Sequence, residues 1–508
     1  MKKALLFLCM VAGLMSCAKE INPQEESPKD GVPMTFNITV LETKAVKTDW
    51  ADGDKIYVFF KGLVTKYLIL ERSGGSWTNT SGGGTLEDTD FSGLGTKELT
   101  AVHFPVAVDV AFADSKFSFT SGGKPVYNYY LFETGKAYTV SGTTVTATIS
   151  MGKPANMVQF HVAGIKANVS DYTFGCPQIK PVACKSVGTD GTITEDELNA
   201  GEHVRGFADS DGGIFAGRLT TTESTNYSFY LGGNNYLYAL TREARTLTAG
   251  KMYNFPAPSV TGSTNWNITA VDLGITVGGN KIYWAKCNLG ANPEIQYPET
   301  DFGDYYAWGE IETYYSSQDP LTWKAGKETK GYDWPSYTWY HNESPEGLTK
   351  YCDIPTSGYP SNFTDGLTSL VPEDDAAYAT LGGKFRMPTK DEMDALVATK
   401  SNTTDYTWAY CDGTSGKKYN NTNARGWKIV KKSSSATLFL PLAGYLNNKN
   451  ASFGQGGHYW SSSLFTNDNS YNAHHLTLTS DMVADPVKVT AMNRKMGYSV
   501  RPVYVIPE

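Results

Sequence analysis

The chain lacks the short motifs that bind nucleotides or carry out hydrolysis. It contains no GxxxxGK[ST] loop, no GxSxG elbow and no HExxH pair, so nucleotide, α/β-hydrolase and zinc-protease functions have no motif to support them. Charge is also scarce, because only 19% of the 508 residues are Asp, Glu, Lys or Arg, and the formal net charge is −8. An acidic chain does not attract the phosphate backbone of nucleic acid. We therefore predict no nucleic-acid partner.

Glycine and the large aromatic residues are abundant instead, with 50 Gly, 32 Tyr and 11 Trp. This mixture favours short strands and turns over long solvated helices. The length favours two to four domains. We predict a multidomain, mainly β protein.

The first residues, MKKALLFLCMVAGLMSC, combine two lysines with an apolar run from Ala4 to Met15. That run is too short for a permanent transmembrane helix, so residues 1–16 are predicted to be a signal peptide. The segment from Leu14 to Cys17 resembles the lipobox of bacterial lipoproteins. The resemblance implies cleavage before Cys17, acyl chains such as palmitate attached there, and a lipid-anchored outer-membrane protein exposed at the cell surface. An ordinary secretory signal with an incidental cysteine is the alternative.

Residues 17–33 follow as the lipidated cysteine and a flexible tether, because they are polar, contain three prolines and lack apolar periodicity. The cysteines beyond Cys17 are Cys176, Cys184, Cys287, Cys352 and Cys411. Their number is odd, so at least one thiol is unpaired. Cys176 and Cys184 lie close in sequence in a compartment that permits oxidation, so they are the predicted bridge if one forms.

Short alternating segments such as MTFNITVLE, KIYVFFKG and MVQFHVAGI fill residues 34–255, bounded by Gly, Asp, Asn or Ser. They predict an all-β, sandwich-type region. ETGKAYTV around Gly135 and LTAGKMYNF around Gly250 resemble each other, so we interpret them as the closing strands of two subdomains, 34–150 and 151–255. Residues 256–268 are interpreted as a linker, rich in Pro, Ser, Thr and Gly. Nine of the eleven tryptophans lie beyond residue 265, so residues 269–508 are predicted to be a different domain.

The first region carries TKAVKTDWADGDKIYVFF and the closing segment GKMYNF. Together they resemble the fimbrillin-like surface lipoproteins of Bacteroidetes. The resemblance implies a pilus-associated protein whose strands are exchanged between subunits, by β-strand addition. The arginine after which shaft subunits are trimmed is not evident near LETKAVK, which favours a tip, accessory or stand-alone role.

The second region carries, in order, VDLGI, YWAKCNLGA, FGDYYAWGE, GGKFRMPTKDEMDAL, LFLPLAGY, HYWSSS and MGYSVRPV. This series resembles the Fibrobacter succinogenes major paralogous domain, a relative of the C-type-lectin-like and formylglycine-generating-enzyme folds. The resemblance implies an α+β domain over 269–508. No cysteine follows Cys411, so the paired thiols of the enzyme relatives are missing and we predict no enzymatic activity.

The charged stretch GGKFRMPTKDEMDALVA has a structural interpretation of its own. Thr389 and Glu392 have the T-x-x-E spacing of a helix capping box, and Met393, Leu396 and Val397 form an apolar stripe behind it. We predict a capped helix here and no catalytic site.

Two further groups of residues are candidates for binding. Glu373, Asp374 and Asp375 could coordinate calcium, although capping the next short helix is the favoured interpretation. Trp339, Tyr340, Asn467, Asp468 and Asn469 fall in segments of turn composition, where side chains face a ligand more often than a core. They are the predicted ligand-binding residues, and no other metal or cofactor is expected.

We therefore predict a cell-surface binding protein or adhesin that recognises a glycan or protein ligand through its lectin-like domain, with other pilus subunits as further partners. The alternatives are a structural anchor or assembly subunit of a pilus and, less favoured, a degenerate formylglycine-type or glycan-active enzyme. A shared fold does not decide among them.

Overall fold

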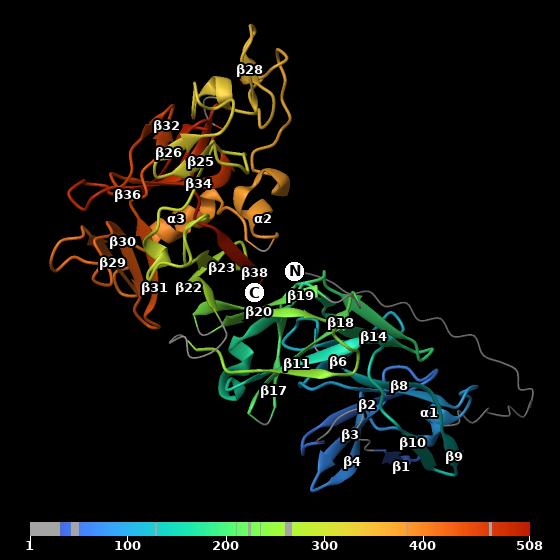
Figure 1. Ribbon diagram of the computed structural model, residues 1–508. Helices are drawn as coiled ribbons and strands as arrows, with labels where there is room; N and C mark the ends of the chain where they lie inside the picture. The colour runs from blue at the N-terminus through green and yellow to red at the C-terminus, as the bar shows by residue number, and fades with distance from the viewer. Residues whose placement is uncertain are drawn as a thin grey trace, which may run out of the picture. The chain divides into compact units, whose positions relative to one another are not determined.

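The computed structural model describes residues 31–41, 50–127, 130–209, 211–221, 225–233, 235–259, 267–383, 385–466 and 470–507. The predicted signal peptide, Cys17 and the three residues Asn467, Asp468 and Asn469 lie outside these ranges. Contacts group the chain into two units, which are described separately: unit 1 holds residues 1–101, 133–151 and 189–192, and unit 2 holds the rest. The described chain is mostly β-strand (Figure 1).

Unit 1 is built on a five-stranded sheet of order β4-β3-β2-β5-β8 and a three-stranded sheet of order β1-β10-β9. The central strand β2, KIYVFF, is almost wholly buried, as expected for a strand covered on both faces. β1 and β10 run parallel, with Thr35 opposite Thr144. The elements are β1 Thr35–Val40, β2 Lys55–Phe60, β3 Tyr67–Ser73, β4 Ser76–Gly82, α1 Asp88–Phe91, β5 Glu98–His103, β8 Leu131–Ala137, β9 Thr139–Ser141 and β10 Thr144–Ile149.

The first part of unit 2 contains two further sheets, of order β13-β18-β11-β21 and β15-β14-β7-β6. β21, the GKMYNF strand, pairs in parallel with β11, as β10 does with β1 in unit 1. In unit 1 the segment ETGKAYTV instead forms β8 and β9. The parallel closing strand of unit 1 is β10, which follows β9 in the chain, so it lies later than the similarity between ETGKAYTV and LTAGKMYNF suggests. The bounds are β6 Asp109–Ala113, β7 Lys116–Thr120, β11 Met157–Ala163, β13 Ile179–Lys180, β14 Val182–Gly188, β15 Ile193–Glu197, β17 Phe207–Ala208, β18 Gly212–Leu219 and β21 Met252–Phe255.

A seven-stranded sheet of order β16-β12-β19-β20-β22-β23-β38 continues across the predicted linker (Figure 1). β20 pairs with β22, with Leu237 opposite Ala270, and one buried cluster contains Leu237, Ala270 and Tyr504. Residues 260–266 lie outside the described ranges, so a domain boundary over 256–268 stays a prediction. The strands are β12 Thr173–Gly175, β16 Val204–Arg205, β19 Thr225–Gly233, β20 Tyr236–Arg245, β22 Asn267–Val277, β23 Asn280–Ala285 and β38 Val503–Pro507.

The remaining part of unit 2 has a five-stranded sheet of order β24-β37-β34-β35-β36, the three-stranded sheet β29-β30-β31 and three two-stranded ribbons. The helices α2 Ala376–Thr380 and α3 Lys390–Ala398 lie between them in sequence. The strands are β24 Tyr305–Tyr306, β25 Tyr315–Gln318, β26 Leu321–Trp323, β27 Tyr340–His341, β28 Gly347–Leu348, β29 Tyr406–Cys411, β30 Gly426–Lys431, β31 Ala436–Pro441, β32 Leu446–Asn447, β33 Asn450–Ala451, β34 Gly457–Leu464, β35 Asn472–Leu478, β36 Val487–Asn493 and β37 Tyr498–Ser499.

Helix α3 confirms the predicted capping box. The Thr389 side chain accepts a hydrogen bond from the Glu392 backbone N–H, and the Glu392 carboxylate accepts one from the Thr389 N–H. Met393 and Leu396 are fully buried, and the partly buried Val397 packs against the same core. Glu392 also pairs with Arg386, whose Nη2 lies 2.5 Å from the Glu392 Oε1.

Among the described residues, no helix has the length and hydropathy needed to cross a membrane.

Candidate functional site

The most suggestive recess among the described residues rests on an aromatic cluster in the C-terminal part of unit 2. Its buried members include Tyr305, Tyr314, Tyr332 and Tyr337. The rings of Tyr314 and Tyr332 are stacked, with centroids 4.3 Å apart and an interplanar angle of 10°. Phenol hydroxyls tie this cluster to the backbone, because Tyr337 Oη donates to the Trp308 carbonyl at 2.6 Å. A rigid, hydrogen-bonded aromatic base of this kind can hold neighbouring loops in fixed positions.

A pocket of about 420 Å³ lies beside this cluster, and we name it the Trp339 pocket. It falls within the size range of small-ligand sites in proteins. Its lining residues are Gly309, Glu310, Ile311, Glu312, Thr313, Tyr314, Lys324, Ala325, Lys327, Thr338, Trp339, Glu373 and Asp374.

Trp339 is held in place on two sides. Its Nε1 donates a hydrogen bond to the Gly309 carbonyl at 2.8 Å, and the Lys350 ammonium lies 4.7 Å from its ring centroid. Gly309 has a φ of +78°, where a side chain would be strained, and a Cβ there would lie 3.4 Å from Trp339 Nε1. The glycine therefore permits the close approach of the indole to the backbone.

The pocket lining includes a partly buried acid, Glu310, and a partly buried base, Lys327. Glu310 Oε1 accepts hydrogen bonds from Tyr314 Oη and from the Thr338 N–H, both at 2.8 Å, while burial raises the pKa of Glu310. The Lys327 ammonium lies 3.7 Å from the Tyr314 ring centroid and donates to the Ser336 carbonyl. Burial lowers the pKa of Lys327. Fixed carboxylate and ammonium groups beside an aromatic ring can bind a hydroxyl-rich ligand.

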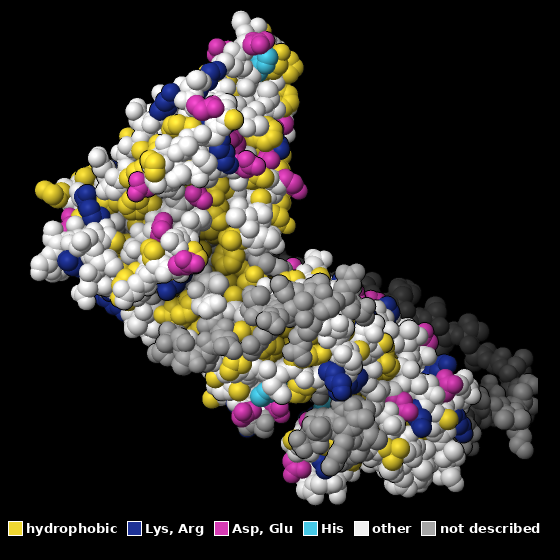
Figure 2. All heavy atoms as spheres, viewed as in Figure 1, with side chains coloured by type: hydrophobic (Ala, Val, Ile, Leu, Met, Phe, Trp, Pro, Cys, Tyr) yellow, Lys and Arg dark blue, Asp and Glu magenta, His cyan; other side chains and the backbone are white. Residues whose placement is uncertain are grey.

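The rim of the pocket is more accessible. Ile311, Glu312 and Glu373 are exposed, and Lys324 Nζ lies 3.5 Å from Glu312 Oε2. On the face shown in Figure 2, acidic and basic side chains are interspersed over the surface. Within the pocket itself, four carboxylates face two lysines, which disfavours a strongly acidic ligand.

A buried arginine, Arg494, helps to hold the Trp339 pocket in place, and the sequence analysis did not identify it. Arg494 is fully buried, its Nη1 donates to the Tyr351 carbonyl at 3.0 Å, and its guanidinium lies 5.4 Å from the Trp308 ring centroid. Arg494 thus fixes the segment that carries Lys350, the residue above Trp339. The sequence NRKMG gives no signal of this role, because both contacts are distant along the chain.

The predicted ligand residues are less exposed than their turn composition suggests. Trp339 and Tyr340 are both partly buried and pack against the aromatic cluster. Tyr340 donates from its hydroxyl to Glu346 Oε2 at 2.5 Å, and its ring lies 5.1 Å from that of Trp334. Trp339 lines the pocket and Tyr340 does not. Asn467, Asp468 and Asn469 lie outside the described residues, so their grouping with Trp339 stays a prediction.

The acidic run at 373–375 acts in helix capping and ion pairing. Asp375 caps α2 by accepting from the Ala377 and Tyr378 N–H groups, which is the favoured interpretation of the sequence. Asp374 Oδ2 lies 2.5 Å from both Lys350 Nζ and Tyr351 Oη. In the described part of the chain, no group of three or more His, Cys, Asp or Glu side chains could hold a metal ion. The calcium alternative therefore gains no support from these residues.

The predicted Cys176–Cys184 bridge is not formed in this structure. Cys176 follows β12 in a buried core, where its Sγ lies 3.1 Å from Gln178 Oε1, whereas Cys184 is a free, buried thiol on β14 of another sheet. Proximity in sequence did not place the two side chains together.

The other cysteines are not activated thiols. Burial raises the pKa of Cys287, Cys352 and Cys411, whereas a reactive thiolate needs a lowered pKa.

No protein-family model matches the chain, and no curated protein matches its sequence. Similar solved structures include a fimbrial protein from Bacteroides ovatus ATCC 8483, with 10% identity and a TM-score of 0.21, covering 93% of this chain and 99% of that chain. Another is the fimbrial anchor protein Mfa2 from Porphyromonas gingivalis, with 11% identity and a TM-score of 0.21, covering 47% of this chain and 96% of that one. A third is a candidate cell adhesion protein from Bacteroides fragilis NCTC 9343, with 12% identity, a TM-score of 0.24 and coverage of 47% and 95%.

Proposed function

We propose that the chain is a lipid-anchored surface adhesin, placed at the tip of a pilus or beside it, whose C-terminal region binds a glycan. The lipobox-like segment ending at Cys17 supports the anchor, and the fimbrillin-like motifs of 34–255 support the pilus association. The resemblance of 269–508 to the Fibrobacter succinogenes major paralogous domain supports a lectin-like binding role.

The observation that carries the binding proposal is the Trp339 pocket. An indole ring offers an apolar face to the C–H groups of a sugar, and Glu310 with Lys327 can exchange hydrogen bonds with its hydroxyls. The excess of carboxylates over lysines favours a neutral sugar over an acidic one. A protein ligand that inserts a small polar loop is the alternative occupant.

A glycan array probed with the full-length chain in detergent tests this proposal. We expect retention on neutral glycans and competition by the free sugar. Retention on no glycan, together with binding to an extracellular-matrix protein, would replace the glycan by a protein ligand.

The membrane anchor is tested by Cys17→Ser, which should abolish palmitate labelling and release the chain from membranes. Continued palmitate labelling of this variant would contradict the anchor.

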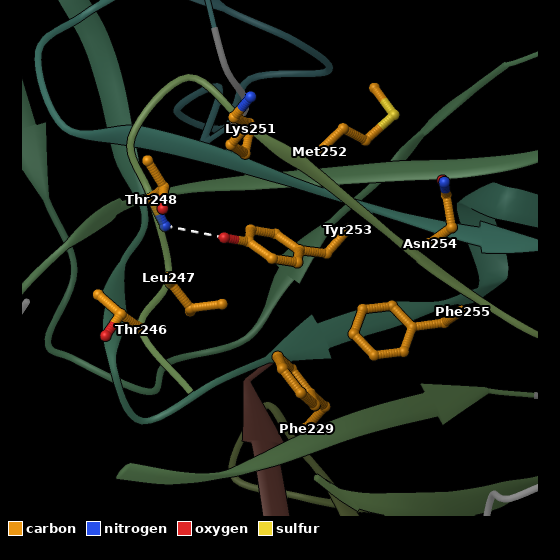
Figure 3. Close-up of a pocket in the computed structure, with 9 residues that line it drawn as sticks. All are labelled: Phe229, Thr246, Leu247, Thr248, Lys251, Met252, Tyr253, Asn254 and Phe255. Atoms are coloured by element: carbon orange, nitrogen blue, oxygen red, sulfur yellow. Dashed lines mark hydrogen bonds between the residues drawn. The ribbon is translucent and has the colours of Figure 1, made fainter. Parts of the chain in front are cut away.

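A structural subunit of a pilus is the second candidate function, and the edge strand β21 favours it. Within the described residues β21 stands at the end of its sheet order, next to β11, and the end of a sheet is where strand addition takes place. A pocket of about 600 Å³ lies beside it. Figure 3 shows the side chains of Phe229, Leu247 and Phe255 at this pocket, with Tyr253 Oη accepting from the Thr248 N–H at 2.8 Å.

Co-purification with pilus filaments tests this second function. Met252 is exposed on β21, so Met252→Lys should leave the fold intact while placing a charge on this terminal strand. Loss of co-purification in this variant supports strand addition at β21. Unchanged co-purification would exclude this edge as the contact.

A further inference from the structure

Another recess lies on the seven-stranded sheet and is unlike the Trp339 pocket in charge. It has a volume of about 680 Å³ and includes the side chains of Lys124, Arg205, Lys281 and Lys431, with Asp171 and Asp272 as its acids. We name it the sheet recess. In a chain of net charge −8, four cations around one cavity form a local positive field.

Asp272 already makes an ion pair and a hydrogen bond within the recess. It is 3% exposed, its Oδ2 lies 2.7 Å from Lys281 Nζ, and its Oδ1 accepts from the Gly274 N–H at 2.6 Å. The carboxylate thus holds Lys281 in place and closes the bulge between Asp272 and Ile275 of β22. Asp272 therefore pairs with Lys281, and the three remaining cations of the recess outnumber its one remaining acid, Asp171.

Lys431 reaches the recess only because residue 274 is a glycine. Gly274 has a φ of +72°, and a Cβ at that position would lie 2.2 Å from Lys431 Nζ. The Lys431 ammonium therefore rests against the backbone of the bulge. Among the described residues, neither Lys431 nor Lys124 has a carboxylate within the 4.0 Å of an ion pair, so both charges are available to an anion.

Two hydroxyl-bearing residues, Thr173 and Tyr283, line the recess together with these cations. Thr173 Oγ1 is buried and has no hydrogen-bond partner in the described part of the chain. It lies close to Tyr283 Oη, because a Cβ on Gly232 would be 3.0 Å from the first and 3.3 Å from the second. Burial raises the pKa of Tyr283 to about 12, so its hydroxyl stays protonated at neutral pH. Two hydroxyls and the amide of Asn235 supply donors and acceptors for sugar hydroxyls.

We propose that the sheet recess binds an acidic saccharide. Lys431, Lys124 and Arg205 hold its carboxylate or sulfate group, and the hydroxyls of Thr173 and Tyr283 hold its ring hydroxyls. The cavity is mostly polar and has the volume of a small-ligand site. Its walls come from β12 before the predicted linker and from β22 and β23 after it, so the intact sheet is required. This site is independent of the Trp339 pocket.

The test is calorimetric titration of the full-length chain with oligogalacturonate, a sulfated glucan and a neutral galacto-oligosaccharide of matched length. We expect at least one acidic probe to bind and the neutral probe to bind about tenfold or more weakly, with affinity falling as salt rises. Lys431→Gln and Gly274→Ala should each weaken binding, the latter without removing a charge. Lys418→Gln, an exposed control with the same loss of charge, should not.

Several results would overturn the proposal. Equal affinity for the neutral probe, equal loss in Lys431→Gln and Lys418→Gln, or inorganic sulfate binding as tightly as either acidic saccharide would each do so. Trp339→Ala separates the two sites, because binding to the sheet recess should survive this substitution. Circular dichroism of each variant identifies a loss of binding that comes from unfolding, and Arg205→Gln then replaces any variant that fails to fold.

Discussion

At the scale of single residues, the C-terminal core contains two histidines, His458 and His475, whose pKa values no carboxylate of the described residues raises. His458 and His475 have ring centroids 5.5 Å apart, and both rings pack on Tyr498 at 4.8 Å. Trp460 and the Thr477 hydroxyl also contact His475. Burial lowers the pKa of His458 to about 4 and that of His475 to about 3.

These histidines predict that stability falls in mild acid. Because their folded-state pKa values lie below the unfolded value of about 6.5, the unfolded chain binds protons first, and stability is lost as pH falls below that value. Between about pH 6 and pH 4.5 we expect a loss of about 1.4 kcal/mol per pH unit for each histidine. Denaturant melts across this range measure it. His458→Gln should flatten the slope, and an unchanged slope in that variant would contradict the assignment.

At the scale of secondary-structure elements, α3 shows what local sequence can predict. The T-x-x-E spacing places both partners of the capping box within one helical turn, so no distant residue is needed to form it. The closing strand of unit 1 was misplaced because strand pairing is decided by residues more than a hundred positions apart. The contacts of Arg494 and the partial burial of Trp339 were missed for the same reason, since the contacts of both side chains are long-range.

The cap predicts a measurable loss of stability. Thr389→Ala removes the hydroxyl that accepts from the Glu392 N–H, and we expect about 1 kcal/mol less stability in urea unfolding. Thr389→Ser keeps the hydroxyl and serves as the control. If Thr389→Ala and Thr389→Ser unfold at the same urea concentration, the capping bond does not contribute.

At the scale of the whole molecule, composition correctly predicted a mainly β chain, while the relation between its two regions was harder to predict. The shift in tryptophan content suggests a boundary at 256–268, yet β20, which precedes it, pairs in one sheet with β22, which begins at its last two residues. Composition describes what each region contains. Composition does not indicate whether strands on the two sides of the boundary are hydrogen-bonded to each other. The sheet recess depends on that pairing.

The shared sheet predicts how the chain responds to protease. Cleavage within 256–268 should give two fragments that stay together, because β20 and β22 remain paired and Leu237, Ala270 and Tyr504 remain in one core. Size-exclusion chromatography of the nicked chain measures this. Fragments that separate without denaturant, each with its own cooperative melt, would instead support two independent domains.

The central claim is that the Trp339 pocket binds the ligand of a surface adhesin. Trp339 and Trp408 are matched for a comparison, because both are partly buried and each donates from Nε1 to one oxygen. The most direct measurement is the affinity of the full-length chain for its array-selected glycan, by calorimetry, in Trp339→Ala and Trp408→Ala. The account predicts a loss of about tenfold or more in Trp339→Ala and little change in Trp408→Ala. Equal affinities in the two folded variants would contradict it.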